Sequence, residues 1–186
     1  MATLPYRGVM LHEEFTAVTG IQMKKKLLAF INNYGQKCLD LLKCRRSAKE
    51  SVRQLEAELQ QLEENARKYR FAVGCVELLP LLVREQPKFL RGPDMHPALH
   101  FEGTNIYEAT DVTVVFEAFN IQVIDIIAGM TAVMEHYWVL DVKYVDQNKN
   151  TIALLEHFCD LPSVSKAPLL LRAISAIKSG SNSVGQ

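Results

Sequence analysis

The chain has 186 residues, of which 48% are apolar and 23% are charged. This apolar fraction is too high for a disordered chain and is sufficient to build a hydrophobic core. The 21 basic residues equal the 21 acidic residues in number, which excludes attraction to polyanions through net charge alone. Four cysteines in a chain of this length exclude a small disulfide scaffold.

The balanced total hides an asymmetry along the chain. Residues 1–92 contain 16 basic and 10 acidic residues, a net charge of +6, whereas residues 93–186 contain 5 and 11, a net charge of −6. The two halves are therefore predicted to have different surfaces. The split is compatible with docking between the halves, with head-to-tail contact between chains, and with a chance distribution in one folded body.

Targeting signals are not recognisable in the sequence. The first 15 residues lack a basic region followed by an apolar run, which argues against a signal peptide. Residues 121–140 come closest to a membrane span, but they include Asp125, Glu135 and His136. We therefore expect no membrane span and a location in the cytoplasm or nucleus, with reduced cysteines.

An apolar ridge with alternating steps of four and three residues is the strongest pattern in the sequence. An average spacing of 3.5 residues over more than six heptads is typical of a helix that packs along one narrow stripe. An unbroken helix over residues 27–73 would be about 70 Å long. The ridge consists of Leu27, Ile31, Tyr34, Cys38, Leu41, Arg45, Ala48, Val52, Leu55, Leu59, Leu62, Ala66, Tyr69 and Val73.

The ridge has one possible break, near residues 44–47. Ser47 and Glu50 have the spacing of a capping box, which would start a new helix. Arg45 also places a charge on the ridge. The sequence therefore leaves two alternatives, one long rod or a helical hairpin, and the continuous phase of the ridge slightly favours the rod.

The apolar ridge suggests association with another helix. We expect it to pair with a second copy of the chain or with another helical protein, while packing against the protein's own C-terminal half is the alternative. The function predicted first is thus a non-enzymatic protein–protein interaction or assembly module. The residues expected to carry the contact are Val52, Leu55, Leu59, Leu62 and Tyr69.

The pattern changes after residue 78. Pro80 should kink or end the helix, and residues 86–97 are rich in proline and glycine, as expected of a linker. Short β-branched and aromatic runs then predict an antiparallel meander with strands at 99–101, 106–107, 112–117 and 121–124, although 111–117 could instead be helical. Further helices are predicted over 126–140, from 148 or 150 to 158, and from Ser165, with Pro168 in its first turn, to a stop at Gly180.

These elements predict a mostly helical, α+β fold. A long, coiled-coil-like N-terminal helix is expected to precede a compact domain with a small antiparallel sheet and several helices. The predicted divisions are a helical arm at 1–85, a linker at 86–97, a small α+β domain at 98–179, and a disordered tail at 180–186.

The C-terminal part resembles a known module. The segments LLPLLVREQPKFL, IDIIAGMTAVMEHYWVLDVKY and NTIALLEHFCDLP occur in this order between residues 79 and 177, with a predicted strand pair after the first. In this respect the chain resembles the C-terminal module of uncharacterised multidomain metazoan proteins, many of them mobile-element-like. The resemblance implies a non-catalytic module and supplies no site residues.

Motifs for catalysis or cofactor binding are not found. The sequence contains no GxxxxGK[ST], GxGxxG, GxSxG or HExxH. His96 and His100 have a metal-ligand spacing, but Pro97 between them argues against the helix that would place both on one ion. We therefore expect no enzyme activity, no metal or cofactor, and no small-molecule substrate.

A basic stretch supports an alternative function. Residues 21–53 contain nine basic and two acidic residues, which could line a helix and contact phosphate groups. The alternative prediction is thus a nucleic-acid-associated scaffold, while a solvated basic face is the simpler interpretation. The candidate contacts are Lys24, Lys25, Lys26, Arg45 and Arg46.

Overall fold

The computed structural model describes residues 5–86, 96–117, 119–162, 165 and 167–179. Within them the chain forms seven α-helices, two short 3-10 helices and one sheet of three strands, which confirms the predicted mostly helical fold with a small antiparallel sheet. The N-terminal elements are α1 (Pro5–Thr19), α2 (Met23–Lys43), α3 (Lys49–Gln60), α4 (Glu64–Leu78) and the 3-10 helix η1 (Leu79–Val83).

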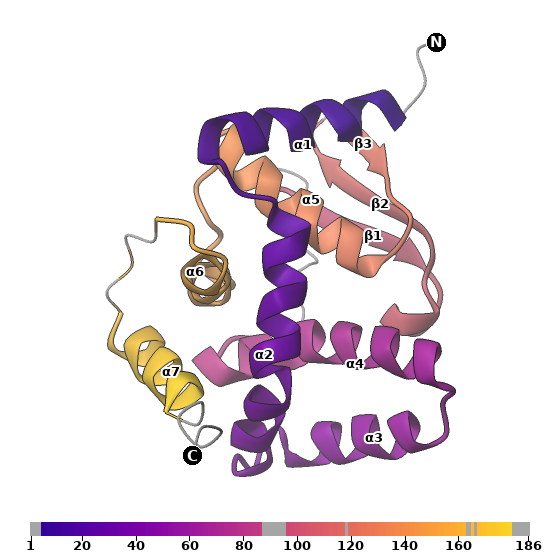
Figure 1. Cartoon of the computed structure of the whole chain (residues 1–186), viewed down its shortest axis with the longest axis vertical. Coiled ribbons are helices and arrows are strands. Elements are labelled where there is room, and N and C mark those ends of the chain that lie inside the picture. The colour runs from indigo at the N-terminus through magenta and orange to yellow at the C-terminus, as the bar shows by residue number, and fades with distance from the viewer. Residues whose placement is uncertain (1–4, 87–95, 118, 163–164, 166, 180–186) are drawn as a thin grey trace, which may run out of the picture.

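The C-terminal half contains the sheet and the remaining helices. Figure 1 shows α2 running through the centre of the molecule, with α1 across one end of it and α6 and α7 beside it. The C-terminal elements are β1 (Ala98–Glu102), η2 (Ile106–Glu108), β2 (Thr110–Phe116), β3 (Phe119–Gln122), α5 (Ile126–Val139), α6 (Lys149–Phe158) and α7 (Pro168–Lys178).

The predicted long rod is wrong, because the chain turns twice within residues 27–73. The first turn follows α2, where the backbone N–H of Ala48 donates to the carbonyl of Arg45. The predicted capping box does not form, since Glu50 pairs with Arg53 instead. The second turn follows α3, and α3 and α4 then pack side by side as a hairpin (Figure 1).

Arg67 closes the turn between α3 and α4. Its Nε donates to the carbonyl of Leu59 at 2.9 Å and its Nη2 donates to that of Leu62 at 2.8 Å. The first bond is to a carbonyl in the last turn of α3, where helix ends leave acceptors without an intrahelical partner, and the second is to a carbonyl of the turn itself. A single basic side chain thus stabilises the reversal that converts a continuous heptad pattern into a hairpin.

The sheet has the order β1–β2–β3, and both strand pairs are antiparallel. The predicted strand at 106–107 is wrong. Those residues form η2, in which the N–H of Glu108 donates to the carbonyl of Asn105 at 3.2 Å. A run of two β-branched or aromatic residues is too short to compete with this local turn.

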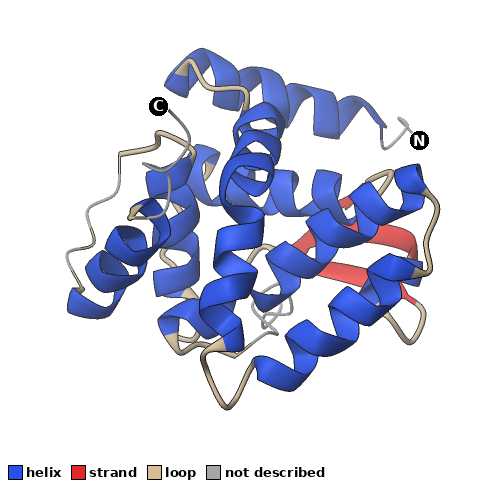
Figure 2. Cartoon of the chain, turned by 60° about the horizontal axis from the view of Figure 1, so that its bottom comes forward, coloured by secondary structure: helices blue, strands red, loops and turns tan. Residues whose placement is uncertain are grey.

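Helix α5 covers the sheet, and its start is as predicted. The carboxylate of Asp125 accepts a hydrogen bond from the backbone N–H of Ala128 at 2.6 Å, as an N-cap residue does. Gly129 brings α5 close to the strands, because a Cβ at this position would lie 2.2 Å from Cδ1 of Leu99. Figure 2 shows the strands, in red, lying among the helices.

Both halves of the chain contribute to one hydrophobic core. Buried residues from Leu11 in α1 to Ile177 in α7 belong to a single cluster. The predicted arm and the predicted C-terminal domain therefore share a core, and α2 contacts α4, α5, α6 and α7. Most of the predicted linker, residues 87–95, and the predicted tail, residues 180–186, lie outside the described residues.

Helix α1 is joined to α5 by a pair of ionisable groups. Nδ1 of His12 lies 2.7 Å from Oε1 of Glu135, and the Glu135 side chain is only 4% exposed. Burial raises the pKa of Glu135 above its ordinary value of 4.5, and the hydrogen bond from His12 opposes this rise. The native state therefore retains the Glu135 proton to a higher pH than the unfolded chain does.

We expect His12→Ala to lower the free energy of unfolding by about 1–3 kcal/mol at neutral pH, because Glu135 then remains buried without this partner. Because the native pKa is raised, this group's contribution to stability falls as pH rises through the interval above 4.5. This decrease in the free energy of unfolding with rising pH should be steeper in His12→Ala. The contribution of Glu135 to the decrease should be absent in His12→Ala/Glu135→Gln. Urea unfolding between about pH 4 and 8 measures it. Equal pH profiles for the two variants would contradict the prediction.

Candidate functional site

Two of the five residues predicted to contact a second helix are buried inside the protein. Val52 is 0% exposed and Leu55 is 2% exposed, because α3 packs on α2 and α4. These two side chains are not available to a partner, so the expectation is corrected for them: the ridge packs within the chain. Leu59, Leu62 and Tyr69 are half-buried, and for them contact with a partner stays a prediction.

Tyr69 also has a role within the fold. Its hydroxyl accepts a hydrogen bond from the backbone N–H of Ile126 at 3.3 Å, which satisfies a donor in the first turn of α5. Tyr69 and Leu62 line a groove of about 390 Å³ together with Tyr107. The guanidinium of Arg70 lies 3.8 Å from the centre of the Tyr107 ring, in a cation–π contact.

The five predicted nucleic-acid contacts fall into two groups. Lys24, Lys25 and Lys26 lie in the first turn of α2, whereas Arg45 and Arg46 follow its last residue. A helix of 21 residues separates the groups by about 30 Å. Lys26 is also bound to Asp160 at 2.5 Å, so the structure does not assemble the five residues into one patch.

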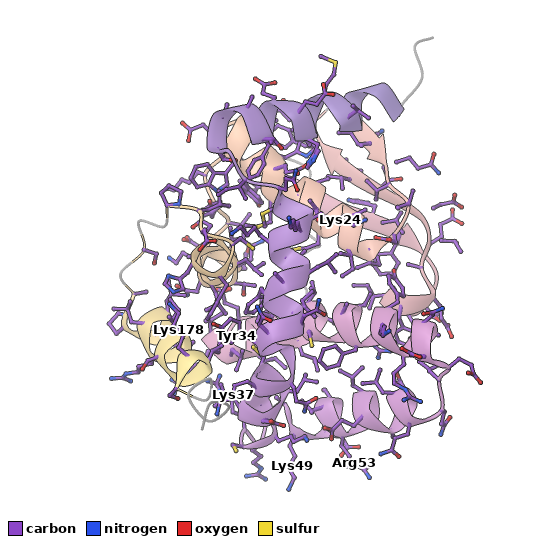
Figure 3. The ribbon with its side chains drawn as sticks, in the orientation of Figure 1. Lys24, Tyr34, Lys37, Lys49, Arg53 and Lys178 are labelled. Atoms are coloured by element: carbon purple, nitrogen blue, oxygen red, sulfur yellow. The ribbon has the colours of Figure 1, made fainter. Side chains whose placement is uncertain are left out.

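Carboxylates neutralise other basic residues of the same stretch. Lys43 pairs with Glu56 at 2.5 Å, and Arg53 pairs with Glu50 at 2.8 Å. Figure 3 shows Lys37 toward the C-terminal end of α2, and Lys49 and Arg53 at the end of the molecule where α2 meets α3. Basic side chains thus lie at both ends of α2, and those at the α2–α3 junction are partly neutralised.

One cleft at this junction collects three arginines. It has a volume of about 550 Å³, and Arg45, Arg46 and Arg84 line it together with the hydroxyl-bearing Ser47. Arg46 and Arg84 are exposed, whereas Arg45 is half-buried. We call this feature the arginine cleft; it is lined by Arg45, Arg46, Ser47, Leu81, Arg84, Glu85 and Gln86.

Local structure explains why Arg84 reaches the cleft. Pro80 lies in the first turn of the short helix η1, which replaces a further turn of α4, because proline has no N–H to donate. Arg84 ends η1 in the left-handed conformation, with φ of 58°. Nη1 of Arg45 donates to the carbonyl of Leu81 at 2.5 Å and so ties the α2–α3 turn to η1.

The cleft is strongly basic. Burial, and then the charge of Arg84, lowers the pKa of the Arg45 guanidinium below its ordinary value of 12.5. A guanidinium remains protonated at neutral pH, so two positive charges repel each other there. An anion placed between them would relieve that repulsion, and planar guanidinium groups are suited to bidentate contacts with phosphate.

Glu85 is the acidic residue of the cleft, and its carboxylate binds α6. Its Oε1 accepts a hydrogen bond from the N–H of Asn150 at 2.8 Å, and its Oε2 accepts from the N–H of Thr151 at 2.8 Å and from the Thr151 hydroxyl at 2.6 Å. The carboxylate thus caps a helix from another part of the chain. The cleft retains three cations against this one anion.

Sequence reasoning found Arg45 and Arg46 but missed Arg84 and the division into two groups. Arg84 lies outside the basic stretch, and no local spacing connects it to Arg45. Its neighbourhood depends on η1 folding back onto the α2–α3 turn. The proline at position 80 was the available signal for a change of chain direction, but it does not specify where the chain goes.

Other chemistry expected or excluded from the sequence can be compared with the structure. Among the described residues, no three His, Cys, Asp or Glu side chains are grouped as a metal site would require, and none of the helices has the length and apolarity needed to cross a bilayer. Burial raises the pKa of both Cys38 and Cys159 to about 12, so these thiols are protonated at neutral pH. A nucleophilic cysteine has a lowered pKa.

Comparisons with protein-family models, with curated proteins and with solved structures found no match to this chain. The interpretation of the site therefore depends on its own residues and geometry.

Proposed function

We propose that the protein is a non-enzymatic binding module that contacts the phosphate backbone of a nucleic acid through the arginine cleft. The observation that carries this proposal is the convergence of Arg45, Arg46 and Arg84 on one cleft. Arginine is suited to phosphate because its planar, permanently charged group donates two parallel hydrogen bonds. Contacts of this kind give affinity without base specificity.

The surroundings of the cleft support the same function. Lys49 lies in the adjacent first turn of α3, is exposed and extends the basic surface beyond the cleft (Figure 3). The residues of the apolar ridge that would have paired with another helix are largely occupied by the protein's own core. Binding of a polyanion requires none of those buried side chains.

The proposal predicts binding that weakens steeply with salt. Three phosphate contacts correspond to a slope of about −2.7 in log K against log salt, so an increase from about 50 to 200 mM salt should weaken binding to duplex DNA roughly 40-fold. Fluorescence anisotropy with a labelled duplex and with a labelled single-stranded RNA measures this directly. No binding of either probe at about 50 mM salt would overturn the proposal.

Two charge reversals of equal size locate the contact. In Arg46→Glu/Arg84→Glu the cleft loses two exposed cations, while Arg45 keeps its bond to Leu81, so binding should fall at least about tenfold. Lys24→Glu/Lys25→Glu changes the net charge equally at the other end of α2 and is the matched control. Equal losses in the two variants would show that overall charge, rather than the cleft, determines binding. Thermal unfolding of both variants establishes that they are folded.

A further inference from the structure

A larger cavity lies on another part of the protein, between the end of α5 and the helix α6. Its volume is about 700 Å³, which is within the range of small-ligand sites. None of the residues of the arginine cleft lines it. We call it the aromatic–acidic pocket; it is lined by Tyr137, Trp138, Asp141, Val142, Lys143, Tyr144, Asp146, Lys149, Ala153, Glu156, Pro162 and Ser165.

A buried carboxylate forms part of the wall of this pocket. Glu156 is 4% exposed, and its Oε1 accepts hydrogen bonds from Nε1 of Trp138 at 3.0 Å and from the hydroxyl of Tyr144. Two donors that converge on one oxygen favour the ionised form of a carboxyl group, which opposes the effect of its burial. A carboxyl group thus lies in the wall of the cavity, and two aromatic side chains fix its direction.

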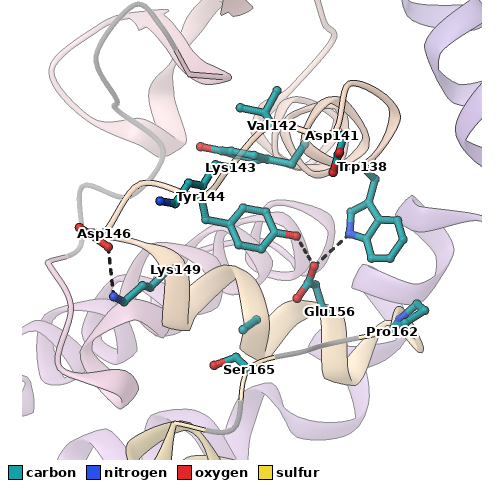
Figure 4. A pocket seen from close by; sticks show the side chains of 12 residues that line it. Trp138, Asp141, Val142, Lys143, Tyr144, Asp146, Lys149, Glu156, Pro162 and Ser165 are labelled. Atoms are coloured by element: carbon teal, nitrogen blue, oxygen red, sulfur yellow. Dashed lines mark hydrogen bonds and ion pairs between the residues drawn. The ribbon is translucent and has the colours of Figure 1, made fainter.

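The rings of Trp138 and Tyr144 can contact a ligand with their faces in addition to donating hydrogen bonds to Glu156. In Figure 4 their polar edges meet the Glu156 carboxylate, and the view looks onto the flat sides of both rings. Tyr137 packs against Tyr144 in a T-shaped contact, with ring centres 5.1 Å apart. The face of an aromatic ring attracts cations.

The remaining charges lie at the rim. Nζ of Lys149 binds the carboxylate of Asp146 at 3.1 Å, and both side chains are more than half exposed. Lys143 and Asp141 are also exposed. Among the described lining residues, the acidic Glu156 is buried, whereas Lys143 and Lys149 are exposed at the rim, and this order favours a cationic ligand over an anionic one.

We propose that the aromatic–acidic pocket binds an alkylammonium group, with the cation beside the Glu156 carboxylate and its alkyl substituents against Trp138 and Tyr144. The chemical class is a primary or methylated amine on a short aliphatic chain, carried by a small metabolite or by a lysine side chain. A cation gains both from the carboxylate and from the ring faces, whereas a neutral molecule of equal shape gains only apolar contact.

Trp138 makes the proposal directly measurable, because it is the single tryptophan in the chain. Its emission should shift when a ligand enters the pocket. The probes are choline and n-butylammonium, and the neutral control is 3,3-dimethylbutanol, which has the shape of choline without its charge. A saturable shift with either cation, at least about tenfold tighter than with the neutral control, is expected.

Three variants separate binding from folding. Glu156→Gln keeps an oxygen that accepts from Trp138 and Tyr144 but removes the charge, so affinity for the cations should fall at least about tenfold. Glu102→Gln removes an exposed acidic side chain that does not line the pocket and should change affinity by less than about threefold. If Glu156→Gln does not fold, Tyr144→Phe keeps the ring, loosens the carboxylate and should weaken binding by a smaller, measurable factor.

The outcomes decide the proposal independently of the nucleic-acid function. A response equal to that of the neutral control, no saturable response to either cation, or unchanged affinity in the substituted pocket would overturn it. A blocked peptide with one lysine, tested beside n-butylammonium, distinguishes the two ligand sources: tighter binding of the peptide assigns a protein lysine, and tighter binding of the free amine assigns a metabolite. Failure of the anisotropy experiment on nucleic acid would leave these measurements unaffected.

Discussion

Leu55→Ala is expected to lower the free energy of unfolding by about 3–4 kcal/mol, because it removes a fully buried leucine from the contact between α3 and α4. The side chain is 2% exposed and packs directly on Gly74. Leu62→Ala is the matched control, since this leucine lies on the same ridge but is half-buried, and it should cost less than about 1.5 kcal/mol. Urea unfolding with a common slope measures both.

A second substitution tests whether the close approach at Gly74 is the reason for this effect. A Cβ on residue 74 would lie 2.5 and 2.7 Å from the two Cδ atoms of Leu55, so Gly74→Ala alone should destabilise the protein by about 1–3 kcal/mol. In Leu55→Ala the obstructing atoms are absent, and alanine also favours the helix by about 1 kcal/mol. The double variant should therefore be more stable than Leu55→Ala. Additive losses would contradict the described packing.

Removal of the Glu85 carboxylate is expected to have the second large effect on stability. Glu85→Ala leaves the N–H groups of Asn150 and Thr151 and the Thr151 hydroxyl without this acceptor. The cap residue of α6, Asn148, forms no side-chain cap bond. Glu85, which is distant in sequence, therefore accepts the hydrogen bonds that an N-cap residue normally accepts. The expected loss is about 2–4 kcal/mol.

Amide exchange shows where this loss occurs. In Glu85→Ala the N–H groups of Asn150 and Thr151 should lose protection more than those of α2, whose hydrogen bonds are unchanged. Glu85→Gln retains one acceptor oxygen and should lie between the wild type and Glu85→Ala in urea unfolding. Equal stability of all three proteins would show that the cap contributes nothing.

Local patterns predicted the elements that depend on neighbours in sequence. Asp125 was expected to start α5, and its carboxylate does accept from the third residue of the helix. The strands around Leu99, Val114 and Ile121 were expected from short runs of apolar, β-branched and aromatic residues, and these three side chains are buried. In each of these cases, the decisive interaction lies within a few residues of the pattern.

Patterns could not predict what the ridge at 27–73 would contact. A 3.5-residue spacing requires a narrow helical surface opposite it, and helices of the same chain satisfy that requirement as well as a second molecule does. In the structure the chain reverses after α3, where Arg67 bonds to two carbonyl groups of the turn, and the ridge packs within the chain. The arginine cleft and the aromatic–acidic pocket are likewise assembled from residues far apart in sequence, and their spacing carries no signal.

The contacts between the two ends of the chain have a consequence for synthesis. His12 bonds to a residue 123 positions later, and Lys26 to one 134 positions later. Because the ribosome releases the N-terminus first, α1 and α2 emerge long before the partners that cover their apolar faces. We expect the nascent chain to expose apolar surface until residue 160 has left the exit tunnel. Premature termination should therefore yield fragments that aggregate or bind chaperones, rather than a smaller native protein.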